Sequence, residues 1–381
     1  MARGSVFQRN GSYGFRIDLE PDPSTGRRRQ MSRQGFRTKR EADNELRKAL
    51  SDVAEGVAVN RTSVDVRTYL DEWLEGQRQH LKETTWSSYE VAVKRITHGL
   101  GASKLKALAP LEIESFYADL AETGSRAGKP LSAKSVRNTH VVLRKALADA
   151  ERLGLVPRNA AAAAKPPTVQ PKEQQTWDSD QLVQFFETVG DDLFFAAYVL
   201  AATTGMRRGE VLGLRWSDVD LDGGQLAVRQ TVTTVNYKPV ITTPKTKRSR
   251  RVVYLDEHTI NVLRAQRRHQ TDERRAAGKA WSDEHDLIFR DELGDMINPD
   301  WFSREFTRQV KLSGLPKIRF HDLRHSYATL ALKAGVHPKV VSERLGHATV
   351  GITLDLYSHV TPAIARDAAD AVAGRLFGGL E

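Results

Sequence analysis

The stretch LFFAAYVLAATTGMRRGEVLGLRW, residues 193–216, decides the fold of the C-terminal half of the chain. Its apolar part, residues 193–203, is the longest apolar run in the sequence, but it has only about half of the ~20 residues that cross a membrane. We therefore expect a buried helix of a globular domain over Leu193–Thr204. A further helix is predicted from Arg207 to Leu214, with Trp216 packed behind it.

The residues that follow this stretch predict a small antiparallel sheet and then more helices. Alternating apolar residues indicate strands at Leu226–Val235, Val240–Thr243 and Arg251–Leu255. The last predicted helix, residues 362–377, carries an apolar stripe. This stripe is expected to pack either on its own domain or on a neighbouring subunit. Helical spacing predicts the other helices at 178–190, 256–278, 299–313, 321–334, 338–346 and 349–356.

The N-terminal residues predict a small antiparallel sheet followed by one helix. Asn10-Gly11 is a hairpin-turn signal, and apolar residues alternate with polar ones over residues 13–19. A basic strand follows at Arg27–Arg33. A helix is expected over Thr38–Glu55, because Glu41 stands at the capping-box position. A unit of this size has a small core, so its basic sheet favours binding over catalysis.

The chain as a whole is predicted to be a multidomain α+β protein. Residues 1–56 form the three-stranded sheet with its helix, and residues 64–156 form an all-helical domain. Residues 157–176, where proline is frequent and apolar periodicity stops, are expected to be a stiff linker. Residues 177–381 form the mainly helical third domain with its small sheet.

The charge of the chain indicates an acidic partner, and nucleic acid is the first candidate. The formal net charge is +10, and residues 1–170 carry 29 basic and 20 acidic residues. Basic residues of the N-terminal strand are candidates for DNA contact, namely Arg27, Arg28, Arg29 and Arg33. Four more lie on one long predicted helix, where a DNA-facing surface and a merely solvated one are about equally favoured, namely Lys134, Arg137, Arg144 and Lys145.

The sequence contains no cysteine, which excludes disulfides, thiolate catalysis and cysteine-based zinc sites. The N-terminus has no apolar signal core, so a cytoplasmic protein is expected.

Five separated motifs contain the residues that are the best candidates for catalysis or phosphate binding. Arg207 and Glu210 stand in GMRRGE, an arrangement in which the arginine can hold a phosphate while the glutamate steadies it. The basic stretch PKTKRSRR, residues 244–251, lies between two predicted strands and is typical of a hairpin tip that grips DNA. His321 and Arg324 share one face of a helix in HDLRH. The last two motifs are LGH, ending at His347, and LYSH, containing Tyr357.

Taken together, these motifs resemble those of the tyrosine recombinase family, and the branch they resemble most is the integrases of phages and integrative elements. The matching stretches are TGMRRGEVLGLRW, TPKTKRSRRVVYL, HDLRHSYATLALKAG, ERLGHATVGIT and LDLYSHV. The motif match as a whole covers about residues 174–361. The order of sheet domain, helical domain and linker also fits this branch. The resemblance implies a site-specific DNA recombinase that works as a tetramer on two DNA sites through a Holliday junction.

The resemblance also implies a role for each matching residue. Arg207 and Arg324 clamp the scissile phosphate, and Tyr357 attacks it to form a 3′-phosphotyrosine. His321 accepts a proton and His347 donates a hydrogen bond. Three further residues complete the set, namely the supporting Glu210, the general acid Lys245 and its rival Lys247. Lys247 and Arg248 are also candidates for DNA contact.

The implied chemistry needs neither a metal ion nor ATP, because the covalent phosphotyrosine preserves the energy of the broken bond. The implied DNA partners are core-type sites for the two C-terminal domains and arm-type sites for residues 1–56. An excisionase or a host DNA-bending protein is a further possible partner.

Three alternatives remain open at this point. A type IB topoisomerase shares the phosphotyrosine chemistry, and a DNA-binding regulator needs only the basic domains. A metal hydrolase is the third, because His321 and His325 stand four residues apart. The metalloprotease motif, however, has glutamate directly after its first histidine, and this chain has Asp322.

Overall fold

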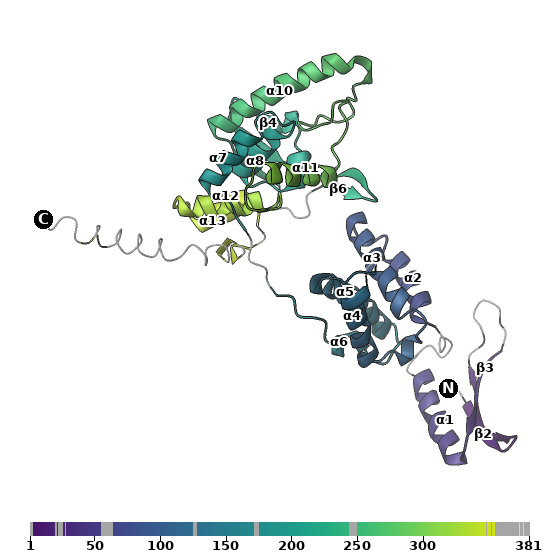
Figure 1. The fold of residues 1–381 in the computed structure, drawn as a ribbon. Coiled ribbons are helices and arrows are strands. Elements are labelled where there is room, and N and C mark those ends of the chain that lie inside the picture. The colour runs from purple at the N-terminus through teal and green to yellow at the C-terminus, as the bar shows by residue number, and fades with distance from the viewer. Residues whose placement is uncertain are drawn as a thin grey trace. The chain divides into compact units, whose positions relative to one another are not determined.

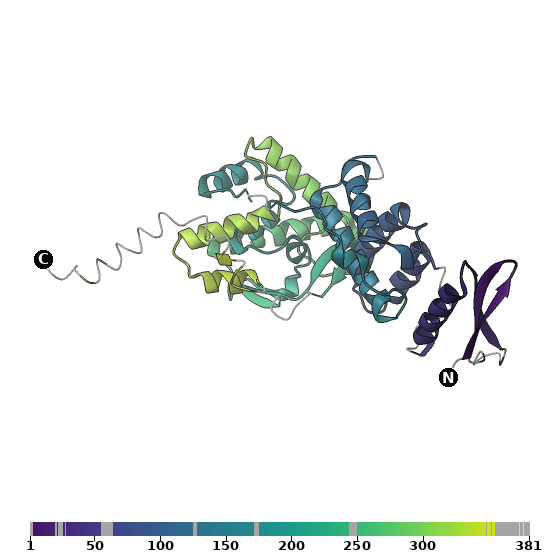
Figure 2. The same cartoon turned by 90° about the horizontal axis from the view of Figure 1, so that it is seen from below.

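The computed structural model describes residues 3–19, 21, 26, 28–54, 64–124, 128–170, 175–243, 250–347, 349–351, 353–354, 373 and 376. The chain divides into two compact units, residues 1–171 and 172–381 (Figures 1 and 2).

The N-terminal part is a three-stranded antiparallel sheet with one helix. Strands β1 (Arg3–Arg9), β2 (Ser12–Leu19) and β3 (Arg29–Phe36) pair in sequence order. The Asn10-Gly11 turn has positive φ at both residues, as the predicted hairpin requires. Phe15 and Ile17 of β2 are fully buried, and they face helix α1 (Lys39–Ala54). Glu41 and Thr38 form the predicted capping box at the start of α1.

The second part is all-helical, as predicted. Its helices are α2 (Val66–Gly76), α3 (Glu83–Gly99), η1 (Leu105–Ala107), α4 (Pro110–Thr123), α5 (Ala133–Arg152) and α6 (Ala160–Ala163). They enclose one core of buried apolar side chains. Helix α6 lies where the sequence predicted the beginning of the linker. The helix forms because alanine favours helix and Asn159 caps its start. Its buried residues Ala160 and Ala161 belong to the core of the helical domain.

The core of the third part forms around α8 (Phe195–Thr204), which is the predicted apolar helix. Eight of its residues are buried. Aromatic rings from α7 (Ser179–Thr188), α11 (Pro299–Leu312) and the segment before α12 (Asp322–Lys333) pack around Tyr198 at centroid distances of 5.5–6.4 Å. Helices α9 (Arg208–Leu212), α10 (Glu257–Ala277), η4 (Gly278–Ala280) and α13 (Pro338–Leu345) complete the described helices. The described part of the chain contains no helix long and apolar enough to cross a membrane.

The strands of this domain form two small sheets. After η2 (Trp216–Asp218), strands β4 (Val219–Asp220), β5 (Gln225–Val228) and β8 (Arg251–Tyr254) pair in the order β4-β5-β8. Strands β6 (Thr231–Val235) and β7 (Lys238–Thr242) form a separate hairpin. The single strand predicted over Leu226–Val235 is therefore wrong, because the chain leaves the first sheet after Val228. The hairpin turn lies at Asn236-Tyr237, while the basic stretch at 244–249 lies outside the described residues.

The predicted fold class is confirmed, since the chain combines a sheet domain, a helical domain and a mainly helical domain with small sheets. The predicted helix over 362–377 lies outside the described residues, apart from residues 373 and 376, which are helical.

We expect the aromatic core to dominate the stability of the C-terminal domain. Phe306 is fully buried against Trp177, Phe185, Tyr198 and Phe320. Phe306→Ala should lower the free energy of unfolding by about 3–5 kcal/mol, measured by urea denaturation. Val183→Ala on α7, where Val183 is 55% exposed, should change it by no more than about 0.5 kcal/mol. Similar losses in both variants would contradict this assignment of the core.

Candidate active site

Three arginines distant in sequence converge on the C-terminal end of α13. Arg251 Nε donates to the carbonyl oxygen of Arg344 (2.6 Å), Arg324 Nη2 to that of Leu345 (2.7 Å), and Arg207 Nη2 to that of Gly346 (3.1 Å). The last carbonyls of a helix have no partner within the helix and carry its negative dipole end. Three successive carbonyls therefore place three guanidinium groups side by side.

Glu210 is the one carboxylate in contact with this group among the described residues, and it is 4% exposed. Arg251 binds it through two hydrogen bonds of 3.1 and 2.9 Å, and Arg207 Nη1 donates to it at 2.8 Å. The backbone N–H of Arg207 also donates to Glu210, which starts helix α9. Burial alone raises the pKa of Glu210, but hydrogen bonds and charge from Arg251 and Arg207 bring it below the ordinary value.

Arg324 is the most deeply buried of the three arginines, at 3% exposed. Its second backbone partner is the carbonyl of Gly205, at 2.8 Å. Burial, and then repulsion by Arg207, lower the pKa of Arg324 to about 9. Gly205 ends α8 with φ of +66°, and a side chain there would collide with Leu345 and Tyr327. Only glycine fits here, so α8, α12 and α13 meet closely at the arginines.

The two predicted histidines lie beside these arginines. His347 Nδ1 shares a hydrogen bond with Thr353 Oγ1 at 2.8 Å. Burial, followed by the positive charge of Arg324 and Arg207, lowers the pKa of His347 to about 4. His321 is an exposed residue at the start of α12, and partial desolvation of its ring, followed by the charges of His325 and Arg324, lowers its pKa to about 4. Both imidazoles are therefore neutral at pH 7, so each has one nitrogen that accepts and one that donates.

The structure thus brings together five of the predicted site residues, namely Arg207, Glu210, His321, Arg324 and His347. The other predicted members of the site, Lys245 and Tyr357, lie outside the described residues, as do Lys247 and Arg248. His321 and His325 do approach each other, with ring centroids 5.2 Å apart. Within the described residues there is no group of three or more metal-binding side chains.

Arg251 is a site residue that the sequence analysis did not single out. It closes the basic stretch 244–251 and begins β8, where its side chain is 7% exposed. Val253, two residues later, faces the core. Because side chains two apart in a strand share a face, the alternation from Val253 back to Arg251 was the available signal.

The predicted DNA-contacting residues have different surroundings. On α5, Lys134, Arg137 and Arg144 are exposed at helical spacing, while Lys145 lies over the ring of Tyr89. In the sheet domain, Arg28 pairs with Asp18, and Arg33 pairs with Glu45 of α1. Arg33 stands opposite the buried Phe15, so it lies on the helix-covered face of the sheet. The side chains of Arg27 and Arg29 are outside the described part.

Three family descriptions match successive parts of the chain. Residues 6–53 match an arm DNA-binding domain, and residues 66–121 match the N-terminal SAM-like domain of phage integrases. Residues 177–363 match the phage integrase family.

Individual proteins similar to the chain are recombinases and integrases. The tyrosine recombinase XerC-like protein of Caldanaerobacter subterraneus is 28% identical over 95% of this chain and 96% of its own length. The ICEBs1 integrase of Bacillus subtilis is 29% identical over 95% of this chain and 96% of its own length. Among solved structures, the Tn1549 transposon integrase with a circular intermediate DNA has a TM-score of 0.68 at 20% identity, covering 82% of this chain and 100% of that one. A lambda integrase dimer bound to a core site has a TM-score of 0.58 at 20% identity, covering 92% and 93%.

Removal of Arg251 should destabilise the domain strongly, because it leaves the buried Glu210 with only one of its two arginines. We expect Arg251→Met to lower the free energy of unfolding by about 3–5 kcal/mol. Arg274→Met, which breaks a pair whose members are both 60% exposed, should cost less than about 1 kcal/mol. The double variant Glu210→Gln/Arg251→Met should be more stable than Arg251→Met alone, and equal stability would argue against the pairing.

The pKa of His347 predicts a loss of stability in mild acid. The unfolded chain binds a proton at the ordinary pKa of 6.5, and the folded chain only near 4. The contribution of His347 to the free energy of unfolding is therefore fully present above pH 6.5, and it is lost as the pH falls from 6.5 toward 4. Urea denaturation at several pH values should show this fall, and His347→Gln should make it shallower. An unchanged slope in the variant would contradict the lowered pKa.

Proposed function

This chain belongs to the tyrosine recombinase family and is a site-specific recombinase of the integrase type, and we propose that it cuts and rejoins DNA through a covalent 3′-phosphotyrosine at Tyr357. The observation that carries the proposal is the placement of three guanidinium groups on successive carbonyls of α13. In this proposal the chain integrates or excises a mobile element.

The arginine group suits the charge of the reaction. Among the described residues, Glu210 is the one carboxylate that pairs with this group, through Arg207 and Arg251, so the three arginines keep an excess of positive charge for a phosphodiester. Arg207 and Arg324 clamp its non-bridging oxygens, on which charge builds in the transition state. Arg251 is a positioning residue that acts through Glu210. Because the groups are fixed before DNA binds, little reorganisation is needed during the reaction.

The neutral histidines serve proton transfer and hydrogen bonding. A tyrosine hydroxyl has an ordinary pKa of about 10, so attack at neutral pH needs a nearby acceptor for its proton. His321 accepts this proton, since its ring is neutral and exposed. His347 donates a hydrogen bond to a phosphate oxygen from the nitrogen that does not contact Thr353.

Lys245 protonates the departing 5′ oxygen, and Tyr357 forms the new bond to phosphorus. Both assignments are supported by the motifs in which the residues stand. When the free 5′ hydroxyl of another strand attacks the phosphotyrosine, the tyrosine leaves and the DNA is rejoined. No bond energy is lost to water, so the reaction requires no ATP.

The sheet domain and the helical domain bind DNA outside the active site. The exposed stripe of Lys134, Arg137 and Arg144 on α5 suits contact with the phosphates of a core site. Residues 1–56 bind an arm-type site, and Arg28, whose side chain is 75% exposed, is a candidate contact. The active assembly is a homotetramer on two DNA sites, and an excisionase or a host DNA-bending protein assists it.

Covalent capture tests the chemistry at the named nucleophile. The protein is mixed with nicked DNA from beside its gene, in EDTA and without ATP, and then denatured with SDS. We expect a covalent protein–DNA band with the unmodified chain and none with Tyr357→Phe. A band that survives in the variant would mean that another residue attacks. Firm binding with no band would favour a non-catalytic DNA-binding regulator. Strand exchange between two duplexes then separates a recombinase from a topoisomerase.

A modified substrate tests the general acid. A 5′-bridging sulfur leaves as a thiolate and needs no proton, so Lys245→Ala should be inactive on ordinary DNA and active on the sulfur-containing DNA. Arg324→Ala should stay impaired on both, because it removes charge stabilisation. Lys247→Ala is the matched control, and rescue of that variant instead of Lys245→Ala would assign the proton donor to Lys247.

A further inference from the structure

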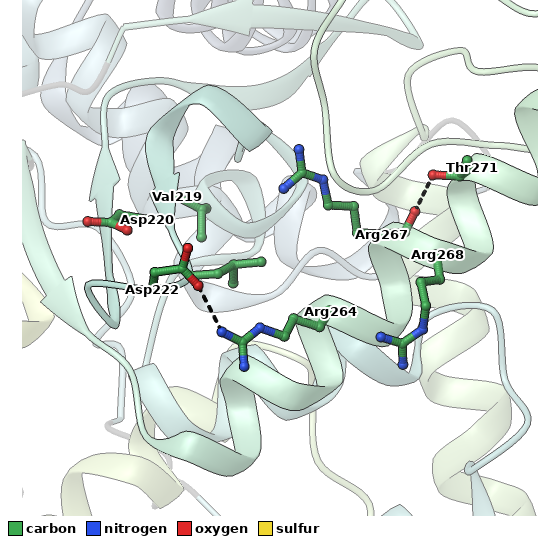
Figure 3. Close-up of a pocket in the computed structure, with 8 residues that line it drawn as sticks. Val219, Asp220, Asp222, Arg264, Arg267, Arg268 and Thr271 are labelled. Carbon is green, nitrogen blue, oxygen red and sulfur yellow. Dashed lines mark hydrogen bonds and ion pairs between the residues drawn. The ribbon is translucent and has the colours of Figure 1, made fainter.

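A groove runs along the outer face of α10, where no predicted site residue lies. It consists of two hollows of about 520 and 340 Å³ that share Arg267 and Thr271. The first lies between α10 and the turn at 219–222, as Figure 3 shows. The second lies between α10 and the loop at 281–290, beside Trp216 and Trp281.

One wall of the groove is a stripe of arginines. Arg264, Arg267, Arg268 and Arg274 are all exposed, and they repeat at the spacing of one helix face. The stripe extends about 15 Å, at ~1.5 Å per residue, which equals four to five residues of an extended peptide at about 3.3 Å each.

The carboxylates that line the groove already have partners within the chain. Asp222 pairs with Arg264 at 2.9 Å, and Asp283 pairs with Arg274 at 2.7 Å. The remaining two accept backbone N–H groups, Asp220 from Gly223 and Asp286 from Ser217, both at 2.8 Å.

Two arginines of the stripe are available for an outside partner. Arg267 lies over the ring of Trp216, 5.4 Å from its centroid, and contacts no carboxylate among the described residues. Arg268 likewise has no carboxylate partner within the described part of the chain. Guanidinium groups bind carboxylates through paired hydrogen bonds, and the neighbouring tryptophan ring offers an apolar surface.

The groove is separate from the arginine site described above. Helix α8 contacts both α10 and α12, and no residue of the arginine site lines the groove. The four aspartates along the walls would repel a continuous polyanion such as a DNA backbone. A peptide can place its own carboxylates at the two arginines and avoid the aspartates.

We propose that the α10 groove binds an acidic peptide segment of a partner protein, with Arg267 and Arg268 as its carboxylate receptors and Trp216 and Trp281 as its apolar contacts. The segment is extended and spans four to five residues. This binding is a second function of the domain, distinct from DNA breakage.

The probe is the fluorescein-labelled, C-terminally amidated peptide Gly-Ser-Glu-Glu-Leu-Ser-Gly, whose two adjacent carboxylates match the two arginines. The full chain is first saturated with a short duplex DNA that occupies its DNA-binding surfaces, and peptide binding is then followed by fluorescence anisotropy. Hydrogen exchange locates the contact, and slower exchange is expected over residues 264–275. The double variant Arg267→Glu/Arg268→Glu should weaken binding by about tenfold or more. Both side chains are exposed, so the variant should fold and should keep covalent capture of DNA.

The matched control is Arg304→Glu/Lys311→Glu, which makes the same change of charge on exposed positions of α11. It should bind the peptide as the unmodified chain does. If both variants bind the peptide equally weakly, the loss of affinity is due to net charge alone and the proposal is overturned. Absence of measurable peptide binding would also overturn it, as would duplex DNA that protects residues 264–275 and displaces the peptide.

Discussion

Three adjacent carbonyl oxygens at the end of α13 hold together a site whose residues come from widely separated parts of the sequence. Each carbonyl accepts a hydrogen bond from a different arginine, and the arginines come from the start of α9, from β8 and from α12. Like charges repel, so this group exists only because the helix end and Glu210 offset the repulsion. The packing of the rest of the domain fixes the positions of α9, β8, α12 and α13 relative to one another.

The packing around α8 explains why this arrangement is rigid. The helix is almost wholly buried, and its C-terminal Gly205 gives both a left-handed turn and a carbonyl for Arg324. Gly346 ends α13 in the same conformation, and its carbonyl holds Arg207. Two helix ends capped by glycine therefore supply hydrogen-bond acceptors at the point where cations gather.

The sequence predicted the residue types of the site better than its internal contacts. Arg207, Glu210, Arg324 and His347 were identified because each stands in a short motif with a chemical meaning. Arg251 was missed because it ends a run of basic residues, and only the alternation of β8 separates it from its neighbours. The break between β5 and β6 and the packing of α6 were also missed, because tertiary contacts decide both.

The lateness of α13 in the chain has a consequence for how the protein is made. Synthesis proceeds from the N-terminus, and domains fold as they emerge. The sheet domain, the helical domain and two of the clustered arginines are translated well before residues 344–346, so the arginines have no common anchor until those residues are made. An incomplete chain that ends before α13 would therefore lack the assembled arginine group.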